Sequence, residues 1–177
     1  GAANPTFTAS YSGFVNSDTD AVVGGTPDFS TTATTNSSVA GSPYDITPSL
    51  GSLTADNYDF TTFVDGDLTV TPATLTVTAE NKSKTYGDAN PTLTASYSGF
   101  VNGETASVLT GSPSLTTSAT TNSTVAGSPY TITAAVGTLA ADNYSFAFVD
   151  GTLAVTPATV TVTVTQNGGI YRLEGTD

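Results

Sequence analysis

Apolar and polar residues alternate with a period of two in short segments along most of this chain. Each segment ends near Gly, Pro, Asn or Asp, which is typical of β-strands bounded by turns. The segments that we expect to form strands in the first half and at the midpoint are 7–11, 28–32, 44–47, 58–60, 68–70 and 75–79. The pattern therefore predicts a mainly β fold.

One segment in each half departs from this alternation. In residues 17–23 and 103–109, polar residues with an early acidic side chain come first, and apolar residues follow. This order predicts a helix of about two turns with an Asn or Ser N-cap. Its apolar end would pack on the sheet, and the alternative is an irregular loop.

Acidic and small residues mark the expected turns. Asp65-Gly66 and Asp150-Gly151 predict tight hairpins, because Gly tolerates positive φ. Asp56-Asn57 and Asp142-Asn143 predict turns of another kind.

The chain is one unit of roughly 86 residues written twice, with about two thirds of the aligned positions identical. Tyr-Ser-Gly-Phe-Val-Asn at 11–16 returns at 97–102. Where the first copy has Thr61-Thr62-Phe63, the second has Ala147-Phe148, which is a single deletion. The two copies should therefore superpose, with a local change at an edge strand or a bulge.

The repeat predicts two modules, residues 1–72 and 73–158, followed by an extra C-terminal strand and tail, residues 159–177. Thr-Pro-Ala-Thr at 71–74 joins the copies and recurs at 156–159. No Gly/Ser-rich linker separates them, so we expect a short, stiff joint and a rod.

Composition excludes several classes of function. Lys82, Lys84 and Arg172 are the only basic residues against 15 Asp and Glu, and the net charge of −12 disfavours binding to nucleic acid or to anionic lipid. No stretch is long and apolar enough to cross a bilayer. The chain has no Cys and no His, so disulfides, thiolate nucleophiles and His-based catalysis are excluded.

The remaining candidates for catalysis are weak. Asp18 with Asp20, and Asp65 with Asp67, are possible carboxylate pairs, but each lies in an expected turn or helix start, and the second copy keeps only one carboxylate of each. A Ser–Lys dyad would have to use Lys82 or Lys84, without a nucleophile elbow. We therefore expect no catalytic residue, no cofactor and no enzyme activity.

Calcium is the most credible metal for a chain rich in Asp and Asn. Side chains that could converge at one end of a sheet are Asp56, Asn57 and Asp65 with their counterparts Asp142, Asn143 and Asp150. No EF-hand pattern accompanies them, so solvated turns are the favoured interpretation and we expect no metal site.

Three segments together resemble a known family: Lys-Ser-Lys-Thr-Tyr-Gly-Asp-Ala-Asn-Pro at 82–91, Gly-Phe-Val-Asn-Gly-Glu-Thr at 99–105 and Asn-Tyr-Ser-Phe at 143–146. The chain resembles two tandem MBG repeats of the Tyr-Gly type, which occur in long bacterial surface and adhesin-like proteins. The resemblance implies an extracellular β-rich module, β-grasp-like or sandwich-like, with one short helix in each copy. It carries no catalytic residues onto this chain.

The repeats are out of frame with the family pattern. The first copy lacks a strand like Leu75–Ala79, and 160–164 supplies an extra strand of that kind with no module after it. Either the chain is a slice of a longer array, or strand 159–165 completes the first copy of a neighbouring molecule, whose sheet would otherwise keep an open edge.

We expect a non-catalytic structural module, a stalk or filament subunit at the bacterial cell surface, with neighbouring copies of itself as partners. The alternative is an adhesin module that binds glycans or mucin, which an aromatic-lined groove with convergent polar groups would favour.

Overall fold

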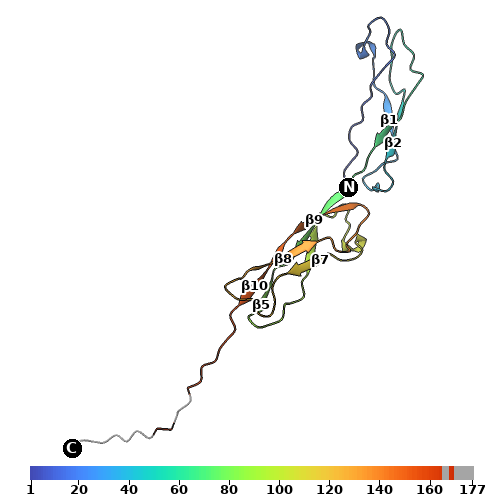
Figure 1. Ribbon diagram of the computed structural model, residues 1–177. Coiled ribbons are helices and arrows are strands. Elements are labelled where there is room, and N and C mark those ends of the chain that lie inside the picture. The colour runs from blue at the N-terminus through green and yellow to red at the C-terminus, as the bar shows by residue number, and fades with distance from the viewer. Residues whose placement is uncertain (165–167, 170–177) are drawn as a thin grey trace, which may run out of the picture.

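The computed structural model describes residues 1–164 and 168–169, and Figure 1 shows two β-rich modules arranged end to end. We call residues 1–72 the first module and residues 73–158 the second module. The described residues contain strands, turns and irregular segments but no α-helix. The predicted mainly β fold is therefore confirmed.

The second module consists of two sheets. Its strands are β4 (Ala73–Ala79), β5 (Lys82–Thr85), β6 (Ala95–Ser98), β7 (Ser114–Thr117), β8 (Tyr130–Ala135), β9 (Tyr144–Val149) and β10 (Gly151–Thr156). One sheet has the order β5-β10-β8-β7, and the other has the order β6-β4-β9. Strand β4 lies in the middle of the smaller sheet, antiparallel to β6 and parallel to β9.

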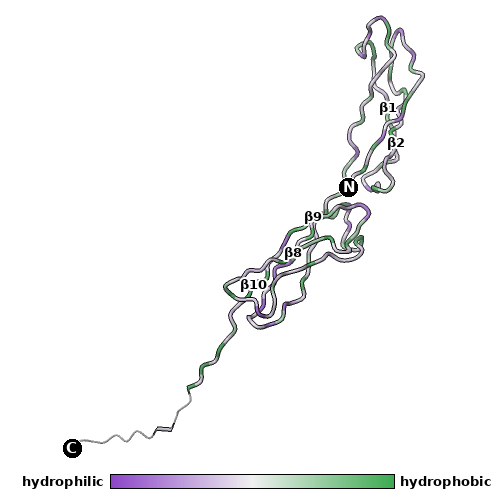
Figure 2. Tube along the Cα trace, in the orientation of Figure 1, coloured by the Kyte–Doolittle hydropathy of each residue, from purple (hydrophilic) through white to green (hydrophobic). Residues whose placement is uncertain are grey.

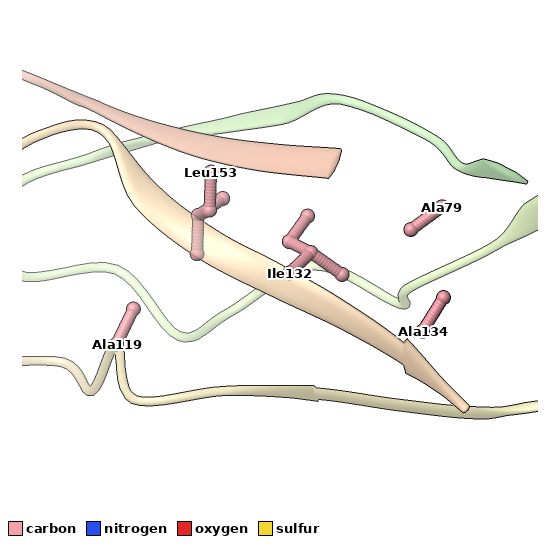
Figure 3. Packing of buried hydrophobic residues seen from close by; sticks show 5 residues of the cluster. All are labelled: Ala79, Ala119, Ile132, Ala134 and Leu153. Carbon is pink, nitrogen blue, oxygen red and sulfur yellow. The ribbon is translucent and has the colours of Figure 1, made fainter. Parts of the chain in front are cut away.

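The core of the second module lies between these sheets, in a sandwich-like arrangement. Every second residue of β4 points inward, so that Leu75 and Val77 are 0 % exposed and Ala79 is 2 % exposed. Ile132 of β8 and Leu153 of β10 are also 0 % exposed. Figure 3 shows Ala79 gathered with Ile132, Ala134, Leu153 and Ala119 in one cluster. Strand β4 thus completes the core.

The first module has a single sheet, β1-β2-β3, made of β1 (Asp28–Ser30), β2 (Tyr44–Ser49) and β3 (Gly66–Leu68). This order matches β7-β8-β10 of the second module, as the repeat predicts. Residues 7–11 and 58–60, however, are not in strands, so these two predictions were wrong. Their counterparts β6 and β9 pair with β4 and not with each other, and no described segment occupies that place in the first module.

The predicted helices are also corrected. A three-residue 3-10 turn stands in each place, η1 (Asp20–Val22) and η2 (Ala106–Val108), capped by Thr19 and Thr105. The backbone becomes extended at the next residue, and Thr110 pairs with Ala140 across an isolated antiparallel bridge. Because this bridge holds the chain extended, a second helical turn cannot form.

The turns are confirmed in part. Asp56-Asn57 and Asp142-Asn143 are turns. Asp150-Gly151 does not make a tight hairpin, because β9 and β10 belong to different sheets and the chain crosses from one to the other there. The deletion at Ala147-Phe148 falls in β9, which is an edge strand, as expected.

Candidate functional site

A groove of about 880 Å³ runs along the first module, between residues 6–14 on one side and 58–64 on the other. Phe29 of β1 and Ile46 and Pro48 of β2 also line the groove. The groove is therefore bounded by two extended segments and by the apolar residues of the sheet.

Aromatic rings contribute much of the lining. Three T-shaped pairs cross from one part of the lining to another, with ring centroids 5.4–6.3 Å apart: Phe7 with Phe29, Tyr11 with Phe60, and Phe14 with Tyr58. Edge-to-face pairs of this kind are stabilising. They hold the two walls of the groove in place although no described strand pairs with either wall.

The second module shows what the groove lacks. The walls of the groove are the counterparts of β6 and β9, and the space between them corresponds to that of β4. Ile132 and Leu153 are fully buried next to β4, whereas their counterparts Ile46 and Leu68 are only half-buried. The sequence predicted one open sheet edge. The structure corrects this: the first module has a gap, and the segments on both sides of it are counterparts of strands that pair with β4.

A second copy of the β4 sequence follows the second module. Residues 156–164 read Thr-Pro-Ala-Thr-Val-Thr-Val-Thr-Val, and residues 71–79 read Thr-Pro-Ala-Thr-Leu-Thr-Val-Thr-Ala. Val160, Val162 and Val164 are 83 %, 86 % and 92 % exposed, and residues 157–164 belong to no strand. Figures 1 and 2 show this segment running away from the module with alternating hydropathy. Thr165, the last residue of the predicted strand, and the tail 170–177 lie outside the described residues.

Tyr58, which lines the groove, makes contacts that sequence reasoning missed. The Tyr58 hydroxyl donates to Asp18 Oδ2 over 2.8 Å and accepts from the Val15 amide over 3.1 Å. The amide of Val15 acts to lower the Tyr58 pKa, but desolvation and the Asp18 carboxylate outweigh it, so this pKa lies above 10.0. Tyr144 binds Glu104 and Val101 in the same way. The repetition of the Asn-Tyr pair was the signal available in the sequence.

The carboxylates of the candidate catalytic pairs lie in a hydrogen bond, at the start of a 3-10 turn and in a strand. Asp18 binds Tyr58, whereas Asp20 begins η1. Asp67 lies in β3 opposite Asp45 of β2. Hydrogen bonds from Thr94 and Lys82, together with the charge of Lys82, hold the pKa of the Glu80 carboxyl below its ordinary value.

The lysines of the possible dyad also have other partners. Lys82 Nζ lies 3.0 Å from Glu80 Oε2. Lys84 is 7 % exposed, and its Nζ donates to the backbone oxygens of Asp88 and Thr120. Neither ammonium group is hydrogen bonded to a serine hydroxyl in the described part of the chain, so these contacts do not form a Ser–Lys dyad.

The possible calcium ligands do not converge. Asp142 and Asn143 precede β9 and Asp150 follows it, so the six residues of that strand separate them. Asn143 Oδ1 accepts from the Val39 amide and Asp150 Oδ1 accepts from the Ala134 amide, both over 2.9 Å. These side chains therefore cap backbone donors at opposite ends of one strand.

Comparison with known families assigns both repeats to one type. Residues 1–69 and 75–154 match the family model described as MBG domain (YGX type). Neither the curated proteins nor the solved structures gave a match. No helix in residues 1–164 and 168–169 is long and apolar enough to cross a membrane.

Proposed function

This chain belongs to the MBG domain family, YGX type, and on that premise we propose that it is a non-catalytic structural module of extracellular stalks or filaments on the bacterial cell surface. Neighbouring molecules are joined by strand donation, in which residues 159–164 of one molecule fill the groove of the next. Its partners are then copies of itself, and the net charge of −12 disfavours nucleic acid and anionic membranes.

One observation carries the proposal. The first module has an open groove where the second module has β4, and the segment with the β4 sequence after the second module is exposed. With the register of β4, Val160, Val162 and Val164 take the inward places of Leu75, Val77 and Ala79. The incoming strand is then parallel to residues 58–63 and antiparallel to residues 9–12.

The donated strand gains free energy from the burial of its valines and from backbone hydrogen bonds. Burying a valine side chain stabilises by about 1.5–3 kcal/mol, so the three valines contribute roughly 5 kcal/mol or more. Backbone hydrogen bonds form on both sides of the strand, since the groove has two walls with unpaired backbone groups. The contact joins one end of a molecule to the other end of the next, so it extends without closing and gives filaments.

The aromatic lining of the groove is the feature that favours glycan binding instead. Aromatic rings at the matching places of the second module, however, flank a strand of the chain itself: Phe148 of β9 is paired with Val77 of β4 in the ladder. The lining therefore fits a β-strand at least as well as a sugar, and a strand also satisfies the backbone groups of both walls.

The test uses the purified chain in three forms: unchanged, Val162→Asp and Thr159→Asp. Val162 has the register of the fully buried Val77, whereas Thr159 has that of the exposed Thr74. Negative-stain imaging and light scattering should show filaments for the unchanged chain and for Thr159→Asp, and monomers for Val162→Asp with unchanged circular dichroism. Soluble oligosaccharides should not compete with assembly.

Denaturing electrophoresis of filaments assembled from the purified chain gives the second half of the test. Strand donation is non-covalent, so it predicts a single band near 17.7 kDa. A ladder of larger bands would instead show a covalent link between copies. That result, filaments that survive Val162→Asp, or saturable binding of a sugar in the groove would each refute strand donation.

A further inference from the structure

The joint between the two modules of one chain is held by two asparagines. The Val39 amide of the first module donates to Asn143 Oδ1 over 2.9 Å, and Asn102 Nδ2 of the second module donates to the Thr35 carbonyl oxygen over 3.1 Å. The backbone oxygen of Asn143 also accepts from the amide of Ala73, where β4 begins. One turn thus fixes both the loop of the first module and the strand that crosses the joint.

Each of the four residues that form these bonds across the joint has an identical counterpart in the other module. The first module has Asn16 and Asn57 where the second has Asn102 and Asn143, and the second module has Thr121 and Val125 where the first has Thr35 and Val39. In the described part of the chain, no hydrogen bond uses the side chains of Asn16 and Asn57 or the amide of Val125.

The local geometry of these counterparts matches that of the joint. Asn16 and Asn102 have φ of 56° and 53°. The loops before Val39 and Val125 close with equivalent bonds, from Ser37 to Thr34 over 3.0 Å and from Ser123 to Thr120 over 3.1 Å. Val39 and Asn143 are half-buried in the joint, whereas Val125 is 39 % exposed and Asn57 is exposed.

The chain is held in the same way just before each of the two Thr-Pro-Ala-Thr segments. The Val70 amide donates to Ser42 Oγ and the Val155 amide donates to Ser128 Oγ, both over 2.8 Å. A strand donated through residues 156–159 would therefore leave the second module as residues 71–74 leave the first.

We infer that the contact between two molecules reproduces the joint within one molecule, bond for bond. This rests on the proposed strand donation. The Val125 amide of one copy donates to Asn57 Oδ1 of the next, and Asn16 Nδ2 of that next copy donates to the Thr121 carbonyl oxygen. All steps from module to module along the filament are then equivalent. The axial repeat of the filament is one module, although its covalent unit contains two.

The experiment compares filaments of the unchanged chain with those of Asn57→Leu and Asn57→Asp by image averaging and by dissociation after dilution. Leu has a similar volume but no acceptor, whereas Asp keeps the acceptor oxygen. The unchanged chain and Asn57→Asp should show a repeat of one module. Asn57→Leu filaments should still form, should show a repeat of two modules, and should dissociate about fivefold faster, as the loss of one hydrogen bond implies.

The outcomes separate this inference from the function on which it rests. Filaments of the unchanged chain with a repeat of two modules, or Asn57→Leu filaments with unaltered repeat and stability, overturn the equivalent joint and leave strand donation intact. A chain that forms no filaments, or filaments that persist with Val162→Asp, overturn the proposed function and the joint together.

Discussion

Leu75 and Val160 hold the same place in two copies of one segment, yet Leu75 is 0 % exposed and Val160 is 83 % exposed. The difference lies in the surroundings, because Leu75 has β6 and β9 on its two sides and Val160 has no paired strand. The same residue pattern is therefore buried where two strands flank it and exposed where none does.

Supplying the missing strand within the chain should abolish assembly. A copy of residues 73–86 placed ahead of Gly1 reproduces the order of the second module, where Tyr86 precedes Gly87. We expect a monomer whose first module melts about 10 °C or more higher, since each kcal/mol raises the melting temperature of a domain of this size by roughly 4–8 °C. Calorimetry and light scattering check this. The same extension with Asp in place of the copied Val77 should have neither effect.

Engineered cysteines should report the register between molecules. Thr76 lies opposite Ser98 in the β4–β6 ladder, and their counterparts are Thr161 and Ser12. The chain has no cysteine of its own. Ser12→Cys with Thr161→Cys should therefore give a ladder of cross-linked multimers on a non-reducing gel.

The matched control shifts one cysteine by two residues. Ser12→Cys with Thr163→Cys places the two Cβ atoms about 7–8 Å apart, beyond the reach of an unstrained disulfide. Equal cross-linking of both pairs would contradict the register that β4 provides.

The two modules should respond differently to the same core truncation. Ile132→Ala removes methylene groups from a fully buried site and should lower the free energy of unfolding of the second module by about 2–5 kcal/mol. Ile46→Ala, at a half-buried site, should cost about 1 kcal/mol in the monomer and more in the filament. Guanidinium unfolding of monomer and filament measures both. Equal costs in the monomer would show that the groove is already closed.

Removal of the Tyr144 hydroxyl should weaken the end of the second module and change its alkaline stability. Desolvation and the hydrogen bond to Glu104 raise the Tyr144 pKa above 10.0. Since the neutral form is favoured in the folded state, the contribution is present below the unfolded pKa and is lost as the pH rises through the folded value. Tyr144→Phe should lower the melting temperature at pH 8 and remove this part of the decline above pH 10.

Ser107→Ala serves as the control for that variant, because it removes a nearby exposed hydroxyl whose hydrogen-bond partner is Thr105. Its melting curve should follow that of the unchanged chain at every pH. An alkaline decline that is identical in Tyr144→Phe and in the unchanged chain would place the responsible group elsewhere.

The sequence by itself determined the two copies, the mainly β fold, the strands predicted within 28–32, 44–47 and 75–79, and the turns at Asp56-Asn57 and Asp142-Asn143. These features depend on local periodicity and turn chemistry, which the residues carry wherever they lie. The sequence also identified the missing strand and the segment 160–164 that resembles it.

Only the tertiary structure decided how these pieces are used. Residues 7–11 have the alternation of a strand, but a strand needs a partner, and the one that pairs with their counterpart β6 is absent from the first module. The sequence likewise did not indicate that β4 lies in the middle of its sheet. Because β4 is central, its absence from the first module leaves a groove between two segments, lined also by the sheet, and not one free edge. Asn143 could be predicted as a turn residue, but its bond to Val39, 104 residues earlier, exists only because the modules meet end to end. Long-range contacts of this kind follow from which surfaces are brought together, and local residue preferences do not encode them.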